Sequence, residues 1–158
     1  AGAADFRFPG ERDNKVRGAK QGVAMDFRFL EPYRPQLLSL LRIVPGLLLF
    51  QYGVAKLFKF PVLPYFANIP PLIVTAGTLE LILGALLILG LFTRLTAFIL
   101  SGEMAFAYFL GHMFKTGTPV WHPLNNGGTA AILFCFVCLY LASAGPGPWS
   151  IDASRGKA

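Results

Sequence analysis

Four long apolar runs constrain this chain more than any other feature of its sequence. They cover residues 36–55, 71–90, 95–111 and 128–144, about 17 to 20 residues each. At a rise of about 1.5 Å per residue, a helix of this length spans or nearly spans a hydrocarbon core of about 30 Å. Inside lipid the backbone must satisfy its own hydrogen bonds, so each run is predicted to be a helix. The predicted fold class is all-α, a membrane-embedded bundle of four transmembrane helices.

Composition supports a lipid-facing surface. The 158 residues are 54% hydrophobic and 14% charged, with a mean hydropathy of +0.56, which is more apolar than a water-soluble domain of this size can bury. The net charge is +6, but all the basic residues except Arg42 lie outside the apolar runs, as topology signals do. Membrane lipids are therefore the predicted partner, and nucleic acid is not.

Charge also divides the chain into three parts. Residues 1–35 form a polar, basic N-terminal extension, residues 36–145 the bundle, and residues 146–158 a short C-terminal tail. No signal-peptide pattern precedes the first run, so we expect the first helix to direct insertion. With four crossings, ten Lys and Arg residues lie on the side of both termini and three on the other. Because Lys and Arg concentrate on the cytoplasmic side of membrane proteins, this count predicts that both termini lie in the cytoplasm. We also expect other protein subunits to order residues 1–35.

Charged residues within the runs share helix faces with glycine. Arg42, Glu80 and Glu103 each lie inside a predicted span, and such groups are expected to turn toward protein and to pair. We expect Arg42 to reach one of the two carboxylates. Three interpretations are open for this polar network: a structural ion network, a proton- or quinone-linked site, or a path for a small solute.

A second polar cluster is predicted at the opposite face of the bundle. Tyr52 and Lys56 end the first run, His112 ends the third, and Asn126 precedes the fourth. Such residues are usually interfacial anchors, and a cofactor-binding role is the alternative. Two histidines without nearby carboxylates do not make a metal site, so none is predicted. Cys135 and Cys138 continue a small-residue stripe, which favours packing over thiol chemistry.

The sequence resembles the DoxX family of small bacterial four-helix membrane proteins. The resemblance extends from about residue 38 to residue 152. Its motifs are LLRIVPGLLLFQYGVAKLF (40–58), LELILGALLILGLFTR (79–94), GEMAFAYFLGH (102–112), PLNNGG (123–128) and GPGPWSID (145–152).

The positions that match the family pattern include every candidate site residue except Tyr52, and one position departs from the pattern. Many relatives carry an acidic residue after the paired glycines, where this chain has Thr129. That departure removes one candidate proton carrier. The matching positions are Arg42, Gly46, Gly53, Lys56, Glu80, Gly84, Arg94, Glu103, His112, Asn126, Gly127 and Gly128.

The resemblance implies a bacterial cytoplasmic (inner) membrane protein linked to redox complexes. Some relatives are subunits of quinone-linked sulfur-oxidising or terminal oxidase systems, and others belong to redox-stress complexes. Our first hypothesis is an accessory subunit of a larger membrane redox or energy-transducing complex. The alternatives are a quinone-linked oxidoreductase subunit, with quinone as the possible cofactor, and a small-solute or proton transporter. Both catalytic and non-catalytic roles are compatible with these residues.

Overall fold

The computed structural model describes residues 27–156, and every regular element in that range is helical. The chain divides into two units, residues 1–31 and 32–158, and the bundle belongs to the second. A short 3-10 helix, η1 (Phe27–Tyr33), comes before the first long helix. We predicted that a partner protein orders residues 1–35. Most of that segment, residues 1–26, lies outside the residues that the structure describes.

Each predicted apolar run forms a helix. The first run lies in α1 (Arg34–Phe58) and the second in α2 (Pro71–Leu89). The third forms α3 (Thr93–Phe106), which continues without a break as the π-helical stretch η3 (Ala107–Met113). The fourth forms α5 (Thr129–Ala144). The short elements η2 (Pro64–Phe66), α4 (Pro123–Asn126) and α6 (Ile151–Ser154) lie in the connections and at the C-terminal end.

Two of the described helices have the length and composition that a membrane span requires. The helical stretches Arg28–Phe58 and Pro71–Leu89 are both long and apolar enough to cross a bilayer, and Thr129–Ala144 is a shorter apolar helix. Together α3 and η3 run for about 30 Å at the usual helical rise. The all-α, membrane-embedded fold predicted from the sequence is therefore confirmed.

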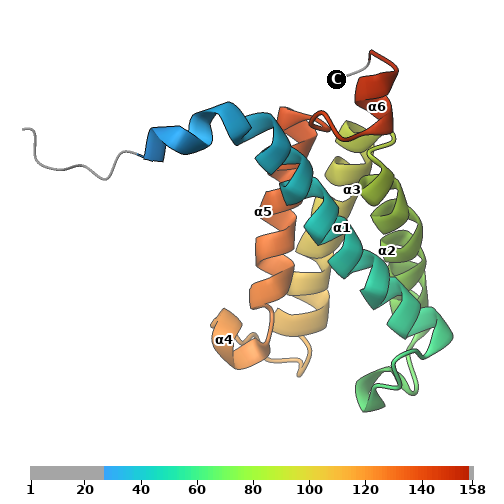
Figure 1. Ribbon diagram of the computed structural model, residues 1–158. Coiled ribbons are helices and arrows are strands. Elements are labelled where there is room, and N and C mark those ends of the chain that lie inside the picture. The colour runs from blue at the N-terminus through green and yellow to red at the C-terminus, as the bar shows by residue number, and fades with distance from the viewer. Residues whose placement is uncertain (1–26, 157–158) are drawn as a thin grey trace, which may run out of the picture. The chain divides into compact units, whose positions relative to one another are not determined.

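Within the bundle the helices form two hairpins. In Figure 1, α1 packs along α2 and α3 packs along α5, whereas α1 and α5 touch over a much shorter length. The hairpins share a core to which all four helices contribute. The core residues are Leu49, Leu87, Ala97, Leu100, Met104, Cys138 and Leu141.

Large apolar side chains cover the outside of the bundle. Leu47, Ile82, Phe98 and Phe136 are each at least half exposed, although they lie in the middle of their helices. Exposure of this kind is unfavourable in water and favourable against acyl chains. The outward surface is therefore the lipid-facing one.

Glycines set the close approach of α1 to α2. A Cβ atom added to Gly53 would lie 2.5 Å from the backbone nitrogen of Leu81 and 2.7 Å from the carbonyl oxygen of Gly77. A Cβ added to Gly84 would lie 2.8 Å from the backbone nitrogen of Phe50. The two backbones can lie this close only because the residue on one side of each contact is glycine, which has no side chain. The glycine-bearing faces predicted on the first two runs are indeed the contact faces.

Candidate functional site

Arg42 lies fully buried at the end of the bundle where α2 ends. Its Nε donates to the carbonyl oxygen of Pro146 at 2.8 Å, and Nη1 donates to that of Ile88 at 2.6 Å. Nη1 also donates to the carbonyl of Leu87, and Nη2 donates to the carbonyl of Trp149. One guanidinium therefore joins α1 to the last turn of α2 and to the segment that follows α5.

This geometry corrects the predicted pairing of Arg42 with Glu80 or Glu103. The last carbonyls of a helix have no intrahelical partner, and those of α2 lie beside Arg42 together with the carbonyls of the turn after α5. Four of the five N–H groups of the guanidinium donate to these carbonyls at the end of α2, which holds Arg42 away from the carboxylates deeper in the bundle. Arg42 is a structural crosslink, separate from the two acidic residues.

Residues 145–152, here called the C-terminal clasp, pack against the bundle. The sequence predicts a short tail here, but the backbone amide of Trp149 donates to Ser39 Oγ of α1 at 3.1 Å. The clasp can turn closely against α1 because Gly147 has a φ of +71°, and a Cβ there would lie 2.5 Å from Ser39 Oγ. The clasp therefore behaves as part of the bundle.

Asp152, a residue that the sequence analysis did not single out, closes the start of α3. Its Oδ1 accepts from the backbone amide of Phe92 at 3.1 Å, and Oδ2 accepts from that of Thr93 at 2.8 Å. No neighbouring side chain caps this helix, so Asp152 does so from 59 residues away. Burial pushes the pKa of Asp152 up, but the amides of Thr93 and Phe92 outweigh that effect and leave the pKa below its usual value.

Replacing Asp152 with alanine should lower the free energy of unfolding by about 1–2 kcal/mol, because two buried amides lose their acceptor. The folded-state pKa lies below that of an unfolded aspartate, about 3.9. This stabilisation is therefore fully present above about pH 4 and is lost as the pH falls through the folded pKa. Denaturation in detergent across acid pH measures both effects. Asp152→Asn keeps one acceptor, so it should lose less stability and show no acid dependence at this site; an unchanged acid dependence would contradict the assignment.

Lys56 and Glu80 form an ion pair between α1 and α2. Lys56 Nζ lies 2.6 Å from both Oε1 and Oε2 of Glu80, and both side chains are largely buried. The ammonium also lies 6.0 Å from the centre of the Tyr52 ring and 5.9 Å from that of the Phe66 ring. Aromatic rings at this distance favour a cation. Lys56 is therefore the counter-ion of Glu80.

Glu103 of α3 lies near this pair without joining it. The charged groups that act on it are Glu80 and Lys56. Both of its carboxyl oxygens are shielded from solvent, and neither has a hydrogen-bond partner among residues 27–156. We call Lys56, Glu80 and Glu103 the acidic cluster. The structure thus brings two of the three predicted network residues together and adds Lys56 from the second predicted cluster.

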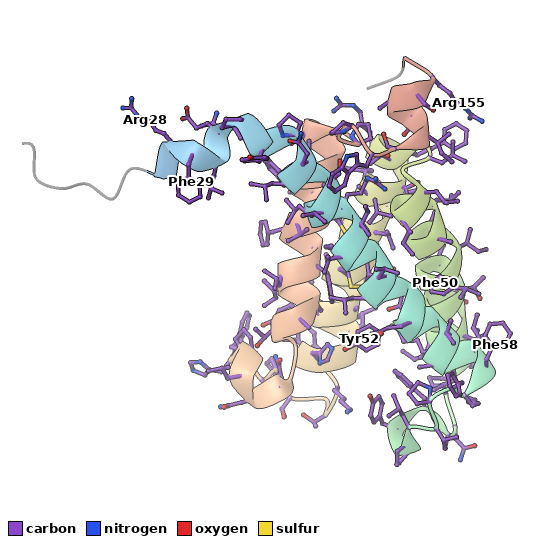
Figure 2. All side chains as sticks on the ribbon, in the orientation of Figure 1. Arg28, Phe29, Phe50, Tyr52, Phe58 and Arg155 are labelled. Atoms are coloured by element: carbon purple, nitrogen blue, oxygen red, sulfur yellow. The ribbon has the colours of Figure 1, made fainter. Side chains whose placement is uncertain are left out.

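The second predicted cluster separates into two pairs. On α1, the ring of Tyr52 lies beside the ammonium of Lys56. Tyr52 and Phe50 project from opposite sides of this helix (Figure 2). His112 in η3 lies with Nδ1 3.0 Å from the carbonyl oxygen of Asn126. The Asn126 side chain donates to the carbonyl of Val120 at 2.8 Å. His112 and Asn126 therefore hold the connection between η3 and α5 in place.

The two cysteines belong to the packing of the bundle. Cys138 is fully buried in the shared core, and Cys135 is partly buried with its Sγ 3.6 Å from Ser101 Oγ. Both thiols are free. The part of the chain that the structure describes holds no group of three or more His, Cys, Asp or Glu side chains that could bind a metal ion.

Comparison with known proteins places this chain in a family. Residues 37–113, which include most of α1, all of α2 and α3, and both carboxylates of the acidic cluster, match the DoxX family. A Haemophilus influenzae protein, named only as an uncharacterized protein, is 42% identical over 126 residues, which cover 78% of this chain and 93% of that protein. No solved structure matches. With these two matches and its bundle of apolar helices, the chain belongs to the DoxX family of membrane proteins.

Proposed function

We propose that this chain is an accessory, non-catalytic subunit of a larger membrane redox or energy-transducing complex. The observation that carries this proposal is an open apolar groove of about 970 Å³ between α1 and α5. Among the described residues that line it, Arg34 and Tyr140 are the polar ones. The apolar lining consists of Leu37, Leu38, Leu40, Leu41, Val44, Pro45, Leu48, Leu133, Phe134 and Val137.

The groove has the length to receive a transmembrane helix of another subunit. Its α1 wall runs from Arg34 to Leu48, about 20 Å at the usual helical rise. Helices associate in lipid through close packing, and a groove gives a partner helix two walls to pack against where a flat face gives one. The groove therefore favours docking to another membrane protein.

The polar groups of the bundle support a structural role. Arg42 is bonded to backbone carbonyls, Asp152 to the start of α3, and Lys56 to Glu80. A group bonded in this way is not available to act on a substrate without breaking the fold. These groups fix the subunit that presents the groove.

Two further features belong to the proposal. DoxX relatives in quinone-linked and redox-stress assemblies make a redox or energy-transducing complex the favoured partner. The resemblance to bacterial DoxX proteins favours a bacterial inner membrane, and the excess of Lys and Arg on the side of the two termini favours a cytoplasmic location for both. We expect residues 1–35 to meet a partner protein on that side.

Filling the groove should release the partner while leaving the bundle intact. Val44, half exposed on the α1 wall, is replaced by tryptophan, which occupies the space that the partner helix would fill. The variant is purified in mild detergent from its native membrane, and the stoichiometry of co-purifying subunits is measured. Ile82→Trp is the matched control, because Ile82 is similarly exposed but lies on α2, outside the groove. Equal partner retention in both variants would argue against docking in the groove.

A quinone-linked oxidoreductase subunit is the second candidate, and Glu103 is the observation that favours it. A buried carboxyl without a hydrogen-bond partner can bond a quinone oxygen, and Lys56 is the cation nearby. Arg42 takes no part, since its donors are occupied at the other end of α1.

Under this second candidate, Glu103→Gln should abolish quinone-dependent electron transfer by the purified complex, because the amide cannot exchange a proton with the quinone. Electron transfer to quinone is measured with the complex kept intact. A fully active Glu103→Gln complex would remove the support for a quinone site here and leave the accessory role standing.

A further inference from the structure

The acidic cluster contains two carboxyl groups and one cation. Lys56 Nζ is 2.6 Å from each oxygen of Glu80, so the attraction of the ammonium is directed to that carboxylate. The pair is electrically neutral. Its geometry leaves the third member, Glu103, without a counter-ion of its own.

Among the described residues, the cation that acts on Glu103 is Lys56, which is already bonded to Glu80. The titratable groups that interact with it come from three helices: Lys56 of α1, Glu80 of α2 and Cys138 of α5. Lys56 is already paired, Glu80 has the same sign of charge, and the Cys138 thiol lies fully buried in the apolar core. Both Glu103 oxygens are shielded from solvent and unbonded within residues 27–156.

In such surroundings the ionised form of the Glu103 carboxyl group is less stable than the protonated, neutral form. An ionised carboxylate in an apolar medium pays a large desolvation cost, which a group avoids by becoming neutral. A second carboxylate beside an ionised one adds repulsion. Both effects act on Glu103 in the same direction.

We propose that Glu103 is a proton-binding site in the interior of the membrane, occupied at near-neutral pH because Lys56 balances only one of the two carboxylates. A proton from water joins one carboxyl oxygen of Glu103. One O–H bond forms, and no electron is transferred. The inference requires neither a partner subunit nor a quinone, so it stands apart from both functions proposed above.

The cluster then follows a charge balance, in which the number of bound protons equals the number of carboxyl groups minus the number of ammonium groups. The wild-type cluster binds one proton, on Glu103. Without Glu80, Lys56 can pair with Glu103, which becomes ionised and releases its proton. Without Lys56, both carboxyl groups become protonated. The same balance lets the proton pass from Glu103 to Glu80 when Lys56 changes partner.

Infrared spectroscopy of the full chain in lipid vesicles tests this balance through the C=O stretching band of a protonated carboxyl group. The wild-type protein should show the band near neutral pH, and Glu103→Gln should remove it. Glu80→Gln should also remove it. Lys56→Met should increase its intensity about twofold, because two carboxyl groups then carry protons.

Controls make the result independent of misfolding. Glu31→Gln alters an exposed glutamate and should leave the band unchanged, and each variant is compared by circular dichroism and gel filtration. If Lys56→Met does not fold, the Glu103→Gln and Glu80→Gln spectra decide the matter. The proposal is overturned if the wild-type protein lacks the band, if Glu103→Gln retains it in full, or if folded Glu80→Gln still shows it.

Discussion

Replacing Arg42 with methionine is expected to lower the free energy of unfolding by about 3–5 kcal/mol, because several buried carbonyls lose a charged hydrogen-bond donor at once. The carbonyls of Ile88, Pro146 and Trp149 would lose their donor, and hydrogen bonds from a charged group each contribute about 1.5–3 kcal/mol. The loss should detach the C-terminal clasp from α1 and α2. Denaturation with increasing SDS in mixed micelles measures the stability, and protease cleavage within the clasp measures the detachment.

Two matched variants isolate the effect of the guanidinium. Arg42→Lys keeps the charge but has one nitrogen in place of three, so it should restore only part of the stability. Arg94→Met removes another arginine at this end, which donates to the carbonyl of Ala142 from an exposed position, and should cost about 1 kcal/mol or less. If Arg42→Met proved as stable as Arg94→Met, the crosslinking role of Arg42 would be wrong.

Replacing Gly53 with leucine is expected to separate α1 from α2 at a cost of roughly 3 kcal/mol or more, the upper part of the range for overpacking. The new Cβ alone would lie 2.5 Å from the backbone nitrogen of Leu81 and 2.8 Å from its Cα. Backbone atoms cannot rotate aside as a side chain can, so the helices must move apart. The separation also pulls Lys56 from Glu80. Disulfide trapping between cysteines introduced on α1 and α2 measures the packing.

The control for this prediction is Gly102→Leu. Gly102 is also a glycine inside a helix, but a Cβ added there meets nothing within 4 Å. Its substitution should leave trapping between α1 and α2 unchanged. Equal loss of trapping in the two variants would show that helical glycine itself, and not close contact between α1 and α2, is what matters.

The helices and their contact faces could be predicted because they depend on local properties of the sequence. Run length and hydropathy locate the four long helices, and the spacing of Gly46 and Gly53 places both on one face of α1. Those signals depend on neighbouring residues only. They need no knowledge of how distant segments meet.

The polar contacts could not be predicted in the same way, because they depend on depth and on long-range contacts. The sequence places Arg42 within reach of a carboxylate, but it does not show that the clasp returns to the same end, 104 residues later, and offers the carbonyl of Pro146. Lys56 has the position typical of an interfacial anchor, yet close packing of α1 and α2 brings it to Glu80. Asp152 carries only a weak signal, an acidic residue in the GPGPWSID motif, opposite a helix start without a cap of its own.

The groove results from the arrangement of the helices, so the hydropathy of the sequence could not predict it. Leu41 and Val44 have the same apolar character as lipid-facing residues, and both are exposed. They become groove walls only because α1 contacts α5 over a short length and leaves space beside Leu133 and Phe134. A surface that docks a helix and a surface that faces lipid differ in shape while sharing composition.

Native mass spectrometry of the chain, released from its own membrane in mild detergent, tests the central claim most directly. An accessory subunit should leave the membrane with a second, different protein in fixed stoichiometry, and Val44→Trp should abolish that species while Ile82→Trp preserves it. Recovery of the wild-type chain solely as a monomer or as a homo-oligomer would contradict the account.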